Sequence, residues 1–557
     1  MSFLDQLNEH QLEAVQCVDH HLRIIAGAGS GKTRVVTTRI AYLINDCGVY
    51  PNKVLAITFT NKAAREMKER VENLLGDVAK AVTISTIHSF CVRLLREDIL
   101  ELGYPRNFTI LDADDQKSIL RDAYKQMHID VKSYSYNSVL SYISNNKTNF
   151  IDAATAKAGA GKWAGEQIKA DVYEFYEKRL KEMYALDFDD LLIFAHRILK
   201  SKEDVRAKWQ RRFTYLHVDE FQDVDNLQYA IIKLLVKEGS YLCVVGDPDQ
   251  TIYTWRGAQV DIIMNFERDF PDSHTVVLNE NYRSTQQILN GANALIKNNR
   301  NRIDKDLFTR VESEDKIIHF SAMDDANEPV WVASKIMTLH HDHVDYRDIA
   351  ILYRTHRQAD ILEYCLQKEN IPYTVAGRDS FLSEPAVRAA IGFFRFLLAP
   401  GDTHSLQTAL ELGWACSPQQ AVRLSAFFPG CSALHENLWD KAEAEFPELP
   451  MRAAVCALRK FSQCAAQESP ARLLERWRDD AGFAGSEPLQ KLIGTALFHR
   501  DMHSLLNALT LGEEADILRA GGKNYATGAV TLMTLHGAKG LEFPCCKIIL
   551  CKGIGKN

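Results

Sequence analysis

Short runs of β-branched and other apolar residues recur along this chain, and longer segments with helical patterning separate them. This alternation is typical of a parallel sheet covered by helices. The first set of predicted strands is Leu22–Ala26, Val54–Thr58, Val82–Ser85, Tyr215–Val218, Leu242–Val245 and Thr275–Leu278. The second set is Lys316–Phe320, Ile349–Tyr353, Val530–Met533 and Lys547–Leu550. The pattern therefore predicts an α/β protein with two cores.

Two long helical segments with few strand signals interrupt these sets, and both are predicted to be insertions into the cores. The first core is expected at 1–110 and 187–277, with a helical insertion at 111–186. The second core is expected at 278–378 and 525–557, with a helical insertion at 379–524.

The composition is that of a globular protein rather than a disordered or repetitive one. The chain has 557 residues, of which 46% are hydrophobic and 25% are charged. No basic-then-apolar leader and no run of about 18 apolar residues is present, so we expect a cytoplasmic protein with no membrane partner. Its 12 cysteines form no Cys-x-x-Cys pair, which gives no signal for a zinc or dithiol site. The net charge of −7 does not by itself indicate a polyanionic partner, although a local groove can still be basic.

The segment Ile24–Arg34 predicts a strand, a phosphate-binding loop and a helix. Such a loop needs glycines so that backbone N–H groups converge on phosphates, a lysine to neutralise them and a hydroxyl to hold Mg²⁺. The loop residues are Ala26, Gly27, Ala28, Gly29, Ser30, Gly31, Lys32 and Thr33. Ala26 stands where the first glycine of the strict pattern would be. The alternative is a glycine-rich turn that binds nothing, which the flanking strand and helix disfavour.

Two adjacent carboxylates, Asp219 and Glu220, follow the predicted strand Tyr215–Val218. Ligands of α/β sheets bind at the carboxyl ends of strands. One carboxylate there can hold Mg²⁺ while its neighbour orients and deprotonates a water. Taken alone the pair is a common solvated loop, but together with the phosphate loop it predicts a nucleotide-hydrolysing site.

Eight segments resemble, in order, the motifs of UvrD/Rep/PcrA-type superfamily 1A DNA helicases. They span about residues 6–550, and the resemblance is weak over about 400–520. The segments are Leu7–Gln11, the phosphate loop, Thr58–Ala64, Thr86–Phe90, Val218–Asp223, Val245–Ala258, Leu278–Ser284 and Val530–Phe543. The resemblance implies two RecA-like P-loop NTPase cores, each with a mainly helical insertion.

The resemblance also implies how ATP and Mg²⁺ are held. Gln11 would bond the adenine edge, and Arg34 and Tyr282 would sandwich its ring. Lys32 and Thr33 would hold phosphates and metal. Asp219 would hold the metal, and Glu220 would be the general base. Gln250 and, from the second core, Arg283 would contact the γ-phosphate. Glu542 would touch the ribose.

A track for single-stranded DNA is implied by aromatic and polar residues in the same motifs. Phe59, Tyr253 and Trp255 are expected to stack on bases, which tolerates any sequence. Thr60, Asn61, His88, Arg256 and His536 are expected to contact phosphates. Because Gln250 and Trp255 share one segment, the phosphate sensor and the base-stacking residue are expected to move together.

These residues imply an ATP-dependent helicase that moves 3′ to 5′ on single-stranded DNA and acts at junctions with duplex, with repair or replication proteins as possible partners. Pro248 and Ala538 differ from the residues that are usual at these motif positions, and we expect the site to tolerate both differences. The chain ends at Asn557 without the family's arginine-rich C-terminal motif, so the sequence predicts a fragment or a natural truncation in which binding survives better than turnover. The alternative function is an ATP-gated single-strand-binding protein without a motor.

Overall fold

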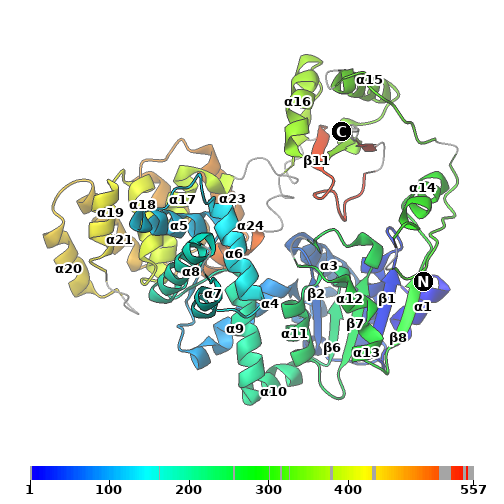
Figure 1. Cartoon of the computed structure of the whole chain (residues 1–557), viewed down its shortest axis with the longest axis horizontal. Helices are drawn as coiled ribbons and strands as arrows, with labels where there is room; N and C mark the ends of the chain where they lie inside the picture. The colour runs from blue at the N-terminus through cyan, green and yellow to red at the C-terminus, as the bar shows by residue number, and fades with distance from the viewer. Residues whose placement is uncertain are drawn as a thin grey trace. The chain divides into compact units, whose positions relative to one another are not determined.

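The computed structural model describes residues 3–161, 164–254, 257–299, 302–313, 316–324, 327–376, 381–428, 434–513, 528–543 and 547–549. The chain divides into two compact units, Met1–Ile317 and Ile318–Asn557. Each unit contains a parallel sheet with helices packed on it, as Figure 1 shows. The prediction of two α/β cores is therefore confirmed.

The sheet of the first unit has six parallel strands in the order β3-β2-β6-β7-β1-β8. Every residue of β1 and of β2 is buried, because helices cover both faces of a parallel sheet. The strands are β1 (Leu22–Ala26), β2 (Val54–Thr58), β3 (Thr83–Thr86), β6 (Tyr215–Val218), β7 (Tyr241–Gly246) and β8 (His274–Leu278). All six predicted strands are confirmed to within one residue at each end.

The helices that accompany this sheet include one between β1 and β2 that begins directly after the phosphate loop, as predicted. They are α1 (Glu9–Gln16), α2 (Lys32–Asn45), α3 (Asn61–Leu75), α4 (Ile87–Asp98), α9 (Phe188–Ser201), α10 (Glu203–Arg212), α11 (Asn226–Leu235), α12 (Val260–Met264), α13 (Phe266–Asp269) and α14 (Gln286–Ile296). A short 3-10 turn, η5 (Pro248–Gln250), follows β7.

A helical segment lies between α4 and α9. Its helices are α5 (Ala113–Met127), α6 (Tyr136–Thr148), α7 (Ala153–Gly159) and α8 (Ala164–Glu182). A two-stranded parallel ladder, β4 (Thr109–Ile110) with β5 (Ala185–Leu186), joins the start and the end of the segment. These helices bury their own apolar cluster, which includes Leu120, Tyr173 and Tyr176. The first core therefore contains a helical insertion, and its limits of 111–186 stay a prediction.

The second unit has a four-stranded parallel sheet in the order β10-β11-β9-β12. Its strands are β9 (Ala350–Tyr353), β10 (Tyr373–Val375), β11 (Val530–Thr534) and β12 (Lys547–Ile549), and α15 (Asn327–His341) and α16 (Ala359–Lys368) pack on them. The predicted strand Lys316–Phe320 is wrong, because this segment pairs with no strand. Ile317 and Ile318 are exposed, and Phe320 stacks on Trp331 of α15. Leu550 lies outside the described residues.

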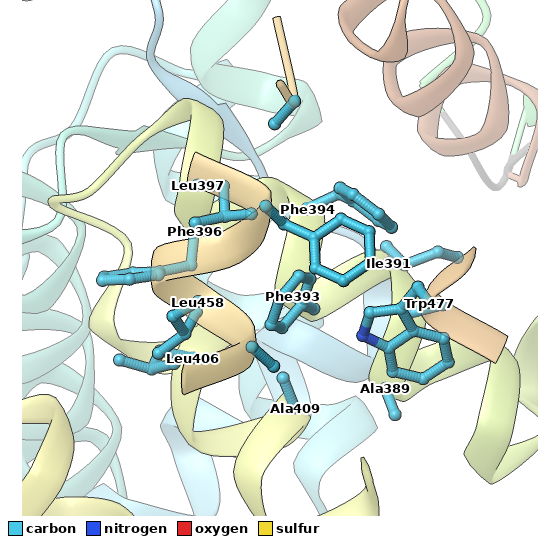
Figure 2. Close-up of a cluster of buried hydrophobic side chains, with 14 of the residues drawn as sticks. Ala389, Ile391, Phe393, Phe394, Phe396, Leu397, Leu406, Ala409, Leu458 and Trp477 are labelled. Atoms are coloured by element: carbon cyan, nitrogen blue, oxygen red, sulfur yellow. The ribbon is translucent and has the colours of Figure 1, made fainter. Parts of the chain in front are cut away.

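In the described part of the stretch between β10 and β11, where the second insertion was expected, there are eight helices. They are α17 (Pro385–Leu398), α18 (Thr403–Gly413), α19 (Pro418–Ser425), α20 (Glu436–Glu445), α21 (Met451–Ser462), α22 (Pro470–Asp480), α23 (Glu487–Ala496) and α24 (Met502–Glu513). Figure 2 shows Phe393 and Phe394 of α17 together with Trp477 of α22 in their shared core. These helices therefore have a hydrophobic core separate from that of the sheet.

The segment after β8 remains part of the first unit. Within it, Asn281 N donates to Phe308 O, and Glu280 and Phe308 form a parallel bridge. Asn281 Nδ2 also donates to Ala28 O, and Leu307 lies against Gly27, so the segment is tied to the phosphate loop. The boundary between the compact units therefore comes later in the chain than the core boundary expected after residue 277. Among the described residues, no helix has both the length and the apolar content needed to cross a membrane.

Candidate active site

Four loops of the first unit meet at one edge of its sheet, because the carboxyl ends of parallel strands point the same way. The phosphate loop follows β1, Asp219 and Glu220 follow β6, and Asp247 follows β7. The segment Asn279–Ser284 follows β8. The two motifs that the sequence separates by almost 190 positions are therefore brought to the same edge.

Two glycine residues and bonds from the segment after β8 fix the conformation of the phosphate loop. Gly29 and Gly31 have φ of 67° and 82°, the left-handed region that favours glycine. Asn281 Nδ2 donates to Ala28 O at 2.6 Å, and Tyr282 N donates to Gly29 O at 2.9 Å. Helix α2 begins at Lys32 immediately after the loop, so its positive dipole end faces the loop. This is the geometry of an anion site.

Lys32 lies among carboxylates at this edge. Its Nζ is 3.4 Å from Glu220 Oε1. Burial lowers the pKa of Lys32, but Glu220, Asp219 and Asp247 outweigh burial and raise it above its ordinary value. Lys32 is therefore a fixed positive charge beneath the loop, suited to neutralising phosphate oxygens.

Glu220 occupies a backbone position that favours glycine, with φ of 51°. Non-glycine residues in this region concentrate at functional sites. Asp219 Oδ1 accepts the Glu220 N–H at 2.9 Å, which fixes the two carboxylates relative to each other. The pair therefore sits in one defined arrangement next to Lys32.

Gln222 connects this pair to the loop after β7 and was not singled out by the sequence. Its Nε2 donates to Glu220 Oε2 at 2.6 Å, and its Oε1 accepts Asp247 N–H at 3.0 Å. Asp247 Oδ2 in turn accepts from Gln250 Nε2 at 2.6 Å. The signal available in the sequence was that Gln222 belongs to the motif segment Val218–Asp223, but its burial and its bonds are visible only in the folded chain.

The expected adenine-binding residues cluster beside the loop. Gln11 is buried and donates from Nε2 to Ser30 O at 3.0 Å, while its Oε1 accepts the Asn8 N–H. Tyr282 is 47% exposed, and its hydroxyl accepts from Asn8 Nδ2 at 2.8 Å. Arg34 donates to Gln6. The structure thus brings these residues to one end of the loop.

Arg283 lies in the first compact unit, whereas the sequence assigned it to the second core. A Cβ on Gly29 would be 2.8 Å from Arg283 Cβ, so the arginine backbone runs directly beside the loop. Its side chain is exposed. The reason for the difference is Asn281, whose bonds to the loop keep this segment on the first unit.

The residue set fits a hard divalent cation. Thr33 offers a hydroxyl and Asp219 a carboxylate, and oxygen ligands of this kind suit Mg²⁺. Asp219 and Glu220 both act on Lys32, so two carboxylates face one ammonium group. An additional cation would therefore be favoured when an anionic phosphate enters.

The described DNA residues predicted in the first unit lie in loops after its strands or in the first turns of the helices that follow. Phe59 and Tyr253 stack on each other with ring centroids 5.1 Å apart, and Tyr253 is 7% exposed. Thr60 caps α3 by accepting the Ala63 N–H, and His88 contacts Phe188 edge-on. Asn61 is the first residue of α3. Trp255 and Arg256 lie outside the described residues.

In the second unit, His536 lies beside Arg354, which the sequence did not single out. His536 Nδ1 is 2.8 Å from Arg354 Nη1. Burial and Arg354 lower the pKa of His536. The two residues follow β11 and β9, which pair directly, and this pairing brings them together. Glu542 is exposed in this unit.

Comparison with known proteins agrees with this geometry. Residues 7–271 match the UvrD/REP helicase N-terminal domain, and residues 276–422 match the UvrD-like helicase C-terminal domain. The chain belongs to the UvrD/Rep helicase family. Its cores are RecA-like P-loop folds, and the family implies use of a nucleotide and binding of DNA.

Named relatives are similar over nearly the whole chain. The ATP-dependent DNA helicase PcrA of Staphylococcus aureus is 38% identical over 572 aligned positions, which cover 98% of this chain and 77% of the relative. The protein of the same name from Staphylococcus epidermidis is 37% identical with the same coverage. The family resemblance expected from the motifs is confirmed.

Proposed function

We propose that this chain is an ATP-dependent DNA helicase that moves 3′ to 5′ along single-stranded DNA and separates duplex. The observation that carries the proposal is the meeting of Lys32, Asp219 and Glu220 at one sheet edge. The family match and the similarity to proteins named as ATP-dependent DNA helicases support it.

Each polar residue at the edge has a task in hydrolysis that its surroundings support. Lys32 and the N–H groups of the loop bind the phosphates of ATP, because they are fixed donors at a helix N-terminus. Glu220 accepts a proton from the attacking water, since its carboxylate is held by Gln222 rather than left mobile. Gln250 and Arg283 contact the γ-phosphate.

Thr33 and Asp219 would hold Mg²⁺, which, when bound, offsets negative charge on the phosphate oxygens. Gln11, with Arg34 and Tyr282, binds adenine. Gln11 is bonded to Ser30 O, so contact with the base is transmitted to the phosphate loop. Glu542 contacts the ribose.

DNA binding is assigned to the loops that carry Phe59 and Tyr253 and to His536, with Thr60, Asn61, His88, Trp255 and Arg256. Tyr253 lies three residues after Gln250, so a change at the γ-phosphate is carried along the backbone to the Phe59 stack. Junctions of single strand and duplex are the expected substrate, and repair or replication proteins the expected partners. A cytoplasmic location also remains a prediction.

The test is the ATPase rate of the full chain with and without a single-stranded oligonucleotide. We expect stimulation by DNA, loss of turnover in Lys32→Ala, and a fall in kcat of about 10²–10⁴-fold in Glu220→Gln with nucleotide binding retained. Glu66→Gln, at an exposed position on α3, is the matched control and should be unchanged.

The alternative, an ATP-gated single-strand-binding protein without a motor, is separated by the same assay. Binding of both ATP and DNA without turnover would support the alternative and contradict the helicase proposal. DNA-stimulated turnover that depends on Lys32 would exclude the alternative.

A further inference from the structure

The loop after β7 holds Gln250 beside the carboxylate of Asp247. Asp247 Oδ1 accepts the Asp249 N–H at 3.0 Å and so caps η5, while its Oδ2 accepts from Gln250 Nε2 at 2.6 Å. The Asp247 N–H donates to Gln222, which bonds Glu220. Any movement of Asp247 therefore changes the placement of both Gln250 and Glu220.

A buried lysine from a distant part of the chain holds this carboxylate. Lys305 Nζ lies 2.7 Å from Asp247 Oδ1 and 2.7 Å from Asp249 Oδ2, and its side chain is 3% exposed. Lysine is almost never fully buried unless it is paired, so this contact is a built feature rather than a surface ion pair.

The segment that carries Lys305 is fixed on the phosphate loop. Leu307 packs so closely on Gly27 that a Cβ there would lie 2.2 Å from Leu307 Cδ2. Asn293 of α14 bonds both the N–H and the carbonyl of Leu307, and Phe308 bridges Glu280. These contacts place the Lys305 ammonium at Asp247 without help from any ligand.

Charge explains why a cation is needed there. Asp247 already acts on Lys32, and it adds negative charge near a site that must accept phosphates. Asp249 has Arg302 Nε at 3.7 Å as a further cationic neighbour. Loss of Lys305 would therefore mainly change the position and the charge balance of Asp247, the carboxylate that bonds Gln250.

We propose that Lys305 is a positioning residue for ATP hydrolysis, acting through Asp247 to hold Gln250 where it contacts the γ-phosphate. This inference rests on the proposed function, because it assumes that Gln250 contacts that phosphate. Lys305 itself touches no substrate. Its segment lies outside the motifs that carry the family resemblance, and long-range pairing of this kind leaves no local sequence signal.

The first test compares Lys305→Met with Lys305→Arg in the full chain. We expect Lys305→Met to lower kcat of the DNA-stimulated ATPase by about 10- to 100-fold with KM changed by less than about 3-fold, since misplacement by about 1 Å has effects of this size. Lys305→Arg should recover part of the rate. Lys297→Met is the matched control, because Lys297 is an exposed lysine near the end of α14 that pairs with Asp306. It should match the parent.

A second readout does not require turnover. The ratio of ADP to ATPγS dissociation constants measures contact with the γ-phosphate, and we expect Lys305→Met to reduce it as Gln250→Ala does. The double variant should be no worse than Gln250→Ala alone, because residues that act as one unit are not additive. This ratio keeps the inference testable if the parent has no ATPase, an outcome that would contradict only the proposed function.

Three results would overturn the inference. The first is a kcat and a ratio in Lys305→Met equal to those of Lys297→Met. The second is a double variant with fully additive losses. The third is a fall in ADP and ATPγS affinity by the same factor together with a lower melting temperature, which would show a structural role alone.

Discussion

At the scale of single residues, buried charge decides how this site works. Lys32 is kept positively charged by carboxylates that outweigh its burial. One of them, Glu220, accepts a bond from Gln222, which also accepts the N–H of another, Asp247. The sequence could predict Lys32, Asp219 and Glu220 because each belongs to a local motif. Gln222 belongs to the same motif as Asp219 and Glu220, but its bonds, like those of Lys305, could not be predicted, since they form only after folding.

His217 gives a residue-scale prediction about acid stability. It lies on β6 and is 1% exposed, and burial followed by Arg39 lowers its pKa from 6.5 to about 3. The unfolded chain therefore binds a proton that the folded chain does not as the pH falls below about 6.5. We therefore expect the contribution of His217 to lower the free energy of unfolding progressively as the pH falls from 6.5 toward 3.

The measurement is the free energy of unfolding against pH for the parent and for His217→Leu, which cannot titrate. The variant should be less sensitive to acid, with a difference of up to about 4–5 kcal/mol at the lowest pH, at about 1.4 kcal/mol for each pKa unit. Parallel curves for parent and His217→Leu would contradict the account.

At the scale of elements, hydrophobic patterning predicted the first sheet almost completely, because its strands are buried on both faces and read as continuous apolar runs. The failure at Lys316–Phe320 has the opposite cause. That run has strand-like composition, yet Ile317 and Ile318 are exposed and no strand pairs with it. The short strand β10 was missed because only three residues pair.

The phosphate loop allows a test in which strain and function are separated. Gly29 and Gly48 have nearly equal φ, 67° and 68°, but a Cβ on Gly29 would meet Asn281 Nδ2 at 2.6 Å, whereas Gly48 has nothing within 4 Å. Alanine costs about 1–2 kcal/mol of backbone strain at both positions. Only Gly29→Ala should also weaken nucleotide binding, by about tenfold or more, or about 1.4 kcal/mol.

Nucleotide affinity measured with a fluorescent ATP analogue distinguishes these variants. Gly48→Ala should lower the melting temperature and leave affinity unchanged. Equal affinities for the two variants would mean that the bond between Asn281 and the loop does not shape the binding site.

The close packing of α17 on α18 can be tested with two glycine-to-alanine variants, one at the contact and one away from it. A Cβ on Gly392 would lie 2.6 Å from Ser405 O, a backbone atom that cannot swing away. Gly392→Ala should destabilise the protein by about 1–3 kcal/mol. Gly494→Ala in α23 meets nothing within 4 Å and should stabilise by about 0.5–1 kcal/mol, because glycine is unfavourable inside a helix. Urea unfolding curves measure both effects, and shifts in the same direction would refute the close approach.

At the scale of the whole molecule, the sequence predicted two cores with one helical insertion each, and both units contain such an arrangement. The exact domain limits remain predictions. The segment after β8 was assigned to the second core because its motif follows the last strand of the first. Asn281, which bonds Ala28, and Leu307, which lies against Gly27, keep it on the first unit through long-range contacts that no local pattern reveals.

Strand separation is the activity that distinguishes a DNA motor from a protein that only binds ATP and DNA. The measurement is ATP-dependent unwinding of a short duplex carrying either a 3′ or a 5′ single-stranded tail, with Lys32→Ala as control. The account predicts unwinding of the 3′-tailed substrate only, and none by Lys32→Ala. Equal unwinding of both substrates would contradict the polarity, and binding of the 3′-tailed substrate without ATP-dependent unwinding would contradict the claim itself.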